Sequence, residues 1–286
     1  MTIAAAPGPA VAPAPLALPP GRYGPLGQLR SEWTKMRTVR STIWSLIATI
    51  IAVVGIGAIA SAVTAAHWRN SGFVDRVTFD PTARSLAGIF LGEIVIGVLG
   101  VLVMSAEYGT GTIRATLSAI PNRPLVLACK TAMFAFIAFV ASEILTFAAF
   151  LLGQQLLKGS TPYATLSQPG VFRAVFGAGL VLTVLGLFAL GLATIIRHTA
   201  GALAAYVGIL LVLPLILQAF PTSWQNAAMR YMPLVIGERM TSVVARGEHA
   251  FSGFPLFSPW VGFGVLCAYA AAALLVGCFV LVRRDA

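Results

Sequence analysis

Residues 86–105 read LAGIFLGEIVIGVLGVLVMS, and Glu93 is the only charged side chain in that run. A helix of about 20 apolar residues is long enough to cross the roughly 30 Å hydrocarbon core of a membrane. Five further runs have the same character, at 42–65, 125–152, 173–196, 199–220 and 260–282. They lack the alternation of polar and apolar residues that marks a membrane barrel strand. We therefore predict six transmembrane helices.

The composition of the whole chain agrees with this expectation. Of the 286 residues, 58% are hydrophobic and 10% are charged, and the mean hydropathy is +0.89. A soluble domain of this length needs far more charge on its surface. The predicted fold class is an all-α polytopic membrane protein with one transmembrane domain over residues 23–286. Residues 1–22, rich in Ala and Pro, are predicted to form a disordered tail.

The positive charge of the chain bears on its orientation. The net charge is +10, which in a soluble protein would suggest binding to nucleic acid. Here Lys and Arg are denser in the N-terminal arm, in residues 105–124, at the turn near residue 197 and in the C-terminal tail than in the other connections. The positive-inside rule then predicts a multi-pass membrane protein with both termini in the cytoplasm, and the charge is explained without a nucleic-acid partner.

Two segments outside the spans are predicted to form helices. Residues 24–40 combine an apolar face with flanking cations, which is typical of a helix lying at the membrane surface; the alternative is a basic flank that only orients the first span. The apolar face consists of Leu26, Leu29, Trp33 and Met36, and the cations are Arg30, Lys35, Arg37 and Arg40. Residues 221–258 are expected to form short extracellular helices before the last span. Pro214 is expected to kink the fifth span.

The polar stretch SAEYGTGTIRATLSAIPNRP, residues 105–124, separates the second span from the third. Gly109 and Gly111 allow a turn, Thr110 or Thr112 is expected to cap a short helix, and Pro124 begins the next span. Glu107 is expected to pair either with Arg114 or with the N-terminal surface helix. An amphipathic cytoplasmic helix with these ends is suited to docking into another protein.

The chain has no recognisable site of its own for ATP. A phosphate loop needs the order G-x-x-x-x-G-K-[ST] between a strand and a helix. In GQQLLKGS, residues 153–160, Lys158 precedes Gly159, so the order is wrong. Cys129, Cys267 and Cys278 are interpreted as apolar filler, and no metal site is predicted. We predict that the chain is not itself an enzyme.

The segments EWTKMRTVRSTIW (32–44) and EYGTGTIRATLSAIPNRPLVLACK (107–130) resemble permease subunits of ABC-2-type transporters from actinobacteria. The resemblance extends over nearly the whole chain after the tail. It implies that residues 105–124 contain the coupling helix, which sits in a cleft of a separate ATPase. Residues matching the inner-loop motif are Glu107, Tyr108, Gly109, Thr112, Ile113 and Arg114; those matching the surface-helix motif are Glu32, Trp33, Lys35 and Arg37.

The same resemblance implies a location in the bacterial plasma membrane, an assembly and an activity. Two ATPase subunits bind ATP and Mg²⁺, and a second permease completes a homodimer or heterodimer. The implied activity is ATP-driven export of a hydrophobic or amphipathic drug, peptide or lipid-like compound.

Glu93 and Glu143 are the two acidic residues expected inside the membrane. Each costs roughly 3 kcal/mol to insert and therefore needs a partner or a polar cavity. They are expected to face each other, Arg84, Arg173 or a cation of an outer helix. They are read either as a substrate or cation contact or as a structural pair. If they formed a proton relay, an ion-coupled secondary transporter would be the alternative function; a non-transporting sensor or assembly protein is the other.

Overall fold

The computed structural model describes residues 24–38, 40–120, 122–243 and 256–283. All of the regular elements in these ranges are helices. The predicted tail at 1–22 and residues 244–255 of the connection before the last span lie outside the described residues.

Six of the helices are long and apolar enough to cross a membrane. They are Ile43–Asn70, Ile89–Gly109, Arg123–Leu157, Val171–Ile196, Thr199–Leu217 and Pro259–Arg283. Many of their outward-facing side chains are large and apolar, including Ile51, Phe136, Ile144, Leu215 and Leu275. An apolar outer surface of this extent fits lipid rather than water. The all-helical, six-span part of the prediction is therefore confirmed.

The spans are built from shorter elements as follows. The first is α2 (Arg40–Ile50), a π-helical segment (Ile51–Gly55), α3 (Ile56–His67) and a 3₁₀ turn (Trp68–Asn70). The next three are α6 (Ile89–Gly109), α8 (Arg123–Leu157) and α9 (Val171–Ile196). The fifth is α10 (Thr199–Val207), a π-helical segment (Gly208–Val212) and α11 (Leu213–Leu217). The last is α14 (Pro259–Arg283).

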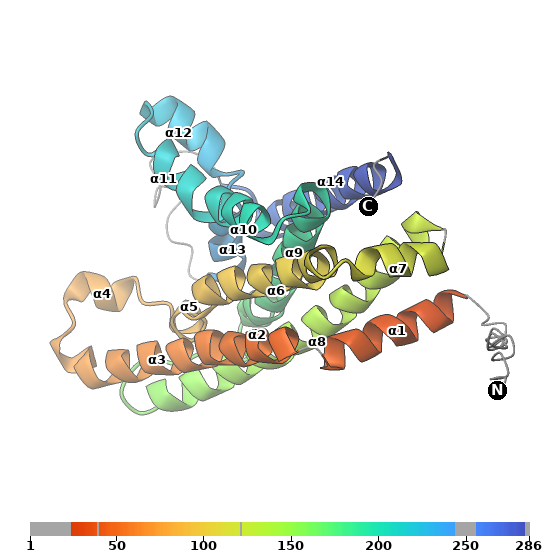
Figure 1. The fold of residues 1–286 in the computed structure, drawn as a ribbon. Coiled ribbons are helices and arrows are strands. Elements are labelled where there is room, and N and C mark those ends of the chain that lie inside the picture. The colour runs from red at the N-terminus through yellow and green to blue at the C-terminus, as the bar shows by residue number, and fades with distance from the viewer. Residues whose placement is uncertain (1–23, 39, 121, 244–255, 284–286) are drawn as a thin grey trace, which may run out of the picture.

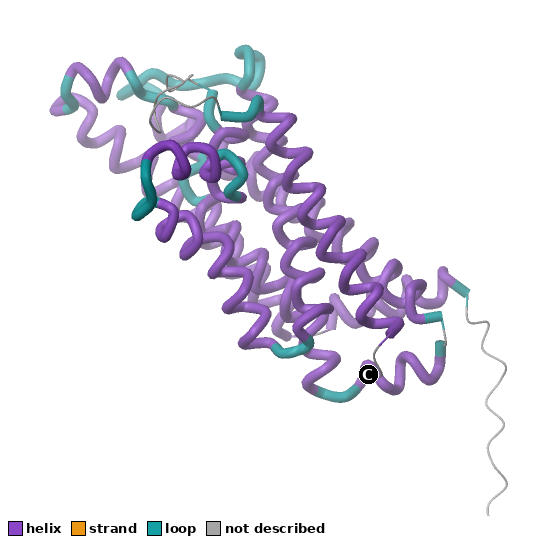
Figure 2. Tube along the Cα trace, turned by 90° about the horizontal axis from the view of Figure 1, so that it is seen from above, coloured by secondary structure: helices purple, strands orange, loops and turns teal. Residues whose placement is uncertain are grey.

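The described part of the chain also contains six short helices: α1 (Pro25–Thr38), α4 (Phe73–Val77), α5 (Pro81–Ser85), α7 (Thr112–Ala119), α12 (Thr222–Met229) and α13 (Pro233–Thr241). Figure 1 places α1, α7 and the C-terminal end of α14 at one end of the molecule, and α4 and α12 at the other. Figure 2 shows the long helices running in roughly one direction between these ends. We call the end with α7 the α7 end. We call the opposite end, where Met240 of α13 contacts Arg173 and Val243 contacts Asp80, the α13 end.

Helix α9 is the centre of the bundle. It packs mainly against α6, α14 and α8, and most of its side chains are buried. Close approach to α6 depends on glycine, since a Cβ added to Gly100 would lie 2.2 Å from the carbonyl oxygen of Gly186. Small residues at such crossings are the usual means by which membrane helices pack.

Of the two π-helical segments, one has a proline in the sequence that explains it and the other has none. The segment at Gly208–Val212 ends two residues before Pro214, whose ring would clash in an α-helix with the carbonyl of Leu210. The wider turn at this point accommodates the proline that was expected to kink the span. The segment at Ile51–Gly55 has no proline near it. A Cβ added to Gly88 would lie 2.3 Å from the carbonyl oxygen of Ala52 and 2.3 Å from that of Val53, both in this segment.

Helix α8 is longer than the predicted span. It continues past residue 152 to Leu157, and its 35 residues extend over about 52 Å. Gln154 stabilises the added turn: its amide nitrogen donates to Ser85 Oγ at 2.7 Å, and its oxygen accepts from Ala164 N at 2.7 Å. The segment 153–160 is thus helical over most of its length.

Helix α1 packs on the bundle through a mostly polar face that its apolar pattern did not indicate. Its buried side chains are Gln28, Glu32 and Met36, spaced four residues apart. Leu26 and Trp33 are exposed. Met36 was predicted to share an apolar face with Leu26 and Trp33, and this was wrong. It lies four residues after Glu32, on the side of α1 that packs against the other helices.

Candidate functional site

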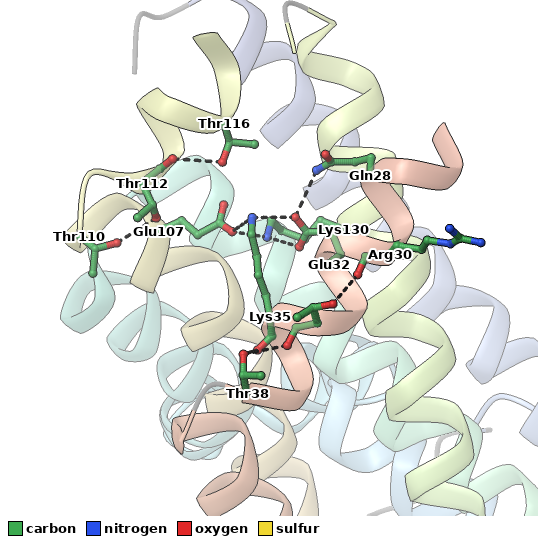
Figure 3. Close-up of polar contacts among 11 residues, drawn as sticks. Gln28, Arg30, Glu32, Lys35, Thr38, Glu107, Thr110, Thr112, Thr116 and Lys130 are labelled. Atoms are coloured by element: carbon green, nitrogen blue, oxygen red, sulfur yellow. Dashed lines mark hydrogen bonds and ion pairs between the residues drawn. The ribbon is translucent and has the colours of Figure 1, made fainter. Parts of the chain in front are cut away.

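Four charged side chains from three helices meet at the α7 end: Glu32 and Lys35 of α1, Glu107 of α6 and Lys130 of α8 (Figure 3). We call them the ion cluster. Lys130 Nζ donates to Glu32 Oε2 at 2.6 Å and to Glu107 Oε1 at 2.8 Å. Lys35 Nζ donates to Glu107 Oε1 at 2.8 Å and to Glu32 Oε1 at 2.9 Å. Each lysine therefore bridges both carboxylates.

The cluster is buried and balanced in charge. Lys130 is 2% exposed, Glu32 1% and Glu107 8%. Removing such groups from water costs several kcal/mol for each ion, which only close partners of opposite charge offset. Two cations facing two anions meet that requirement. Gln28 adds a further donor to Glu32 at 3.2 Å.

Lys35 is the member of the cluster that reaches water. Its burial by itself lowers the pKa of the ammonium group, but the hydrogen bonds and charges of Glu107 and Glu32 outweigh this effect and raise the pKa above its usual value. Lys35 therefore stays protonated throughout the physiological range. Its contribution to stability is complete below the unfolded pKa and is lost only as the pH rises through the folded pKa.

The cluster decides between the two partners expected for Glu107. The carboxylate pairs with Lys35 of the N-terminal helix α1 and with Lys130, whereas Arg114 is exposed on α7. The sequence pattern indicated no partner for Lys130. The separation of 98 residues between Lys130 and Glu32 explains why.

The link from α6 to α7 is a short turn. Gly111 has φ +70°, the left-handed region in which glycine is favoured, whereas Gly109 is still helical. The expected threonine cap is absent from the N-cap position of α7, which Gly111 occupies; Thr110 instead donates to Ala106 O at 2.8 Å.

Helix α7 has one buried side and one exposed side. Ile113 is 2% exposed and anchors the helix in the bundle. Thr112 and Arg114 are exposed. Leu117, partly buried against the same core, adds to this anchor. The predicted short amphipathic helix between the second and third spans is therefore present.

Tyr108 connects the end of α6 to the turn between α9 and α10. The guanidinium of Arg197 lies over its ring, 5.5 Å from the centroid, and also donates to Val280 O of α14 at 3.0 Å. Arg123, at the start of α8, donates to Leu281 O at 3.0 Å. These contacts and the ion cluster join the ends of α6, α8, α9 and α14 at the α7 end of the molecule.

A cavity of about 330 Å³ adjoins the ion cluster and extends to Thr112. Met36, Leu102 and Val103 form its apolar part. Of the other predicted surface-helix residues, Trp33 is 43% exposed and Arg37 is exposed. Neither takes part in the cluster.

Glu93 and Glu143 do not form the predicted pair in the described part of the chain. Glu93 on α6 is buried against Gly237 of α13, and Glu143 on α8 lies against Gly179 of α9. Nor are the expected arginines their partners: Arg84 donates to Thr64 Oγ1 at 2.6 Å, and Arg173 donates to the carbonyls of Met240 and Ser242.

In comparisons with known proteins, no family model matches the chain and no curated protein matches its sequence. Its six apolar helices are those of a multi-pass membrane protein. Among the residues that the structure describes, no group of three or more His, Cys, Asp or Glu side chains is arranged to hold a metal ion.

Proposed function

We propose that this chain is the membrane-spanning permease subunit of an ATP-driven exporter whose ATPase is a separate protein. The observation that carries the proposal is the ion cluster directly beside α7. It ties the end of α6 that leads into α7 to α1 and α8 by buried ion pairs. The sequence motif that contains Glu107 and Arg114 supports the same role.

In this proposal α7 is the coupling helix. Its exposed side, with Thr112 and Arg114, docks into a cleft of the ATPase, and Ile113 holds it in the bundle. Only the short turn at Gly111 separates α7 from α6. A push on α7 therefore displaces α6 together with α1 and α8, because breaking the buried ion pairs would cost more than moving the helices as a unit.

The arrangement in the membrane follows from the density of Lys and Arg. The α7 end faces the cytoplasm, α1 lies at the inner membrane surface with Leu26 and Trp33 toward lipid, and α12 and α13 are extracellular. Two ATPase subunits bind ATP and Mg²⁺, and a second permease completes the transporter in the bacterial plasma membrane. The cargo is hydrophobic or amphipathic.

One observation favours the second candidate, an ion-coupled secondary transporter. Glu93 is 2% exposed and its Oε2 has no hydrogen-bond partner among the described residues, and buried acids inside the membrane mark the proton relays of pumps and transporters. The separate surroundings of Glu93 and Glu143 argue against a relay between them. A non-transporting sensor or assembly protein, the third candidate, would need no ATPase.

The test is purification of the complex and measurement of ATP hydrolysis stimulated by candidate cargo. We expect an ATPase to co-purify with the chain. Arg114→Glu should lower the stimulated rate about tenfold, since reversal of one interface charge costs about 1.4 kcal/mol or more.

Lys158→Glu is the matched control, because Lys158 is exposed on the connection that follows α8 at the α13 end. It should leave the stimulated rate unchanged. Equal effects of the two reversals, or a pure chain that transports without any nucleotide-hydrolysing companion, would contradict the proposal.

A further inference from the structure

A cavity of about 380 Å³ lies at the α13 end, between the α5–α6 segment and α13. Its volume is within the range of pockets that hold drug-sized ligands. Apolar side chains form most of its wall, among them Leu86, Phe90 and Leu234. Two acidic residues, Glu93 and Glu238, also line it, and none of the described lining residues is Lys or Arg.

Glu93 is the buried acid of this cavity. Its residue is 2% exposed, and its Oε2 has no hydrogen-bond partner among the described residues. The main chain at this point is held in place, since Tyr206 Oη donates to Glu93 O at 2.6 Å. A buried carboxylate that is held rigidly and lacks a donor is a binding group for a cation or a hydrogen-bond donor.

The neighbouring helix α13 is shaped to this carboxylate. A Cβ on Gly237 would lie 2.4 Å from Glu93 Oε1, so glycine allows α13 to pack directly on the acid. The next residue, Glu238, is exposed and adds a second negative charge to the lining. An exposed acid and a buried acid on one apolar cavity attract cations and disfavour anions.

We propose that this cavity binds an amphipathic organic monocation, with its protonated amine at the Glu93 carboxylate and its apolar body against Phe90, Leu86 and Leu234. As the substrate class of the exporter, the assignment rests on the proposed function. The binding itself is a property of this chain alone. An inorganic cation would make no contact with the apolar wall, and a neutral lipid chain would supply no hydrogen-bond donor to the carboxylate.

The test uses the purified full-length chain in nanodiscs of zwitterionic lipid, without an ATPase. The probe is dansylcadaverine, whose primary amine is protonated at neutral pH, and binding is read as saturable dansyl emission excited through the protein's tryptophans. The N-acetyl derivative of the probe has the same apolar body and no charge. We expect the amine to bind at least about tenfold more tightly than the N-acetyl derivative, because only the amine forms a charged hydrogen bond with a buried partner.

Variants then locate the site. Glu93→Gln should weaken binding of the amine about tenfold or more and leave binding of the N-acetyl derivative unchanged. Glu143→Gln makes the same change at an intramembrane acid outside the cavity and should affect neither probe. Phe90→Ala should weaken both, and since Phe90 is 45% exposed this variant remains informative if Glu93→Gln fails to fold.

The proposal is overturned if the wild-type chain shows no saturable binding, if the two probes bind equally, or if Glu93→Gln leaves the affinity for the amine unchanged. These failures are separate from failure of the proposed function. Glu93-dependent binding by a chain that recruits no ATPase would keep the site and reject the exporter. Coupled ATP hydrolysis without such binding would do the reverse.

Discussion

Lys130→Met is expected to lower the free energy of unfolding by about 3–5 kcal/mol, the usual cost of removing one partner from a buried ion pair. Methionine fills much of the space of the lysine side chain, so the loss comes mainly from charge. Glu32 and Glu107 would share Lys35 as their sole remaining cation in the cluster, and each would lose a contact shorter than 3 Å. The purified chain is titrated from mild detergent into SDS, and unfolding is monitored by the loss of helical circular dichroism.

Two further variants separate charge from packing. Lys158→Met makes the same substitution at an exposed lysine at the α13 end and should change the unfolding free energy by less than about 0.5 kcal/mol. Adding Glu32→Gln and Glu107→Gln to Lys130→Met removes the buried anions together with the cation and should restore much of the lost stability. A triple variant as unstable as Lys130→Met alone would show that packing around Lys130, and not its charge, stabilises the bundle.

The six spans could be predicted from the sequence because each depends on its own residues. A run of about 20 apolar residues has to satisfy its backbone hydrogen bonds internally once it is in lipid, whatever surrounds it. The ends were less certain where tertiary contacts intervene. Gln154 prolongs α8 through partners on α5 and the following loop. No local sequence pattern indicates this extension of the helix.

The ion cluster could be predicted only in part. Glu32 and Lys35 lie three residues apart on one helix, so their pairing follows from the sequence. Glu107 lies just after the second apolar run and Lys130 lies within the third, and a charge buried at such a place needs a partner. Which partner it finds depends on the crossing of α1, α6 and α8, and Lys35 is separated from Glu107 by 72 residues.

Glu93 shows the same division between local and tertiary information. Its place within an apolar run predicts a polar cavity or a partner. The sequence could not indicate that Gly237 of α13 would cover it, because the two residues meet only when α13 packs on the bundle. The paired interpretation with Glu143 failed for that reason.

Gly100→Ala is expected to destabilise the chain by about 1–3 kcal/mol, although alanine favours an isolated helix by about 1 kcal/mol over glycine. The new methyl group would lie 2.2 Å from Gly186 O and 3.2 Å from Leu190 N, both main-chain atoms of α9. No side-chain rotation relieves such a contact, so α6 and α9 must move apart. SDS titration of the purified variant measures the loss.

Gly264→Ala on α14 is the matched control, because nothing lies within 4 Å of the position a Cβ would take there. Helix propensity predicts that it is neutral or slightly stabilising. The difference between the two variants therefore isolates the close approach of α6 to α9 from any general preference of these helices for alanine. If both behaved alike, the distance between α6 and α9 would have to be larger than the one described, and the glycine at position 100 would have no packing role.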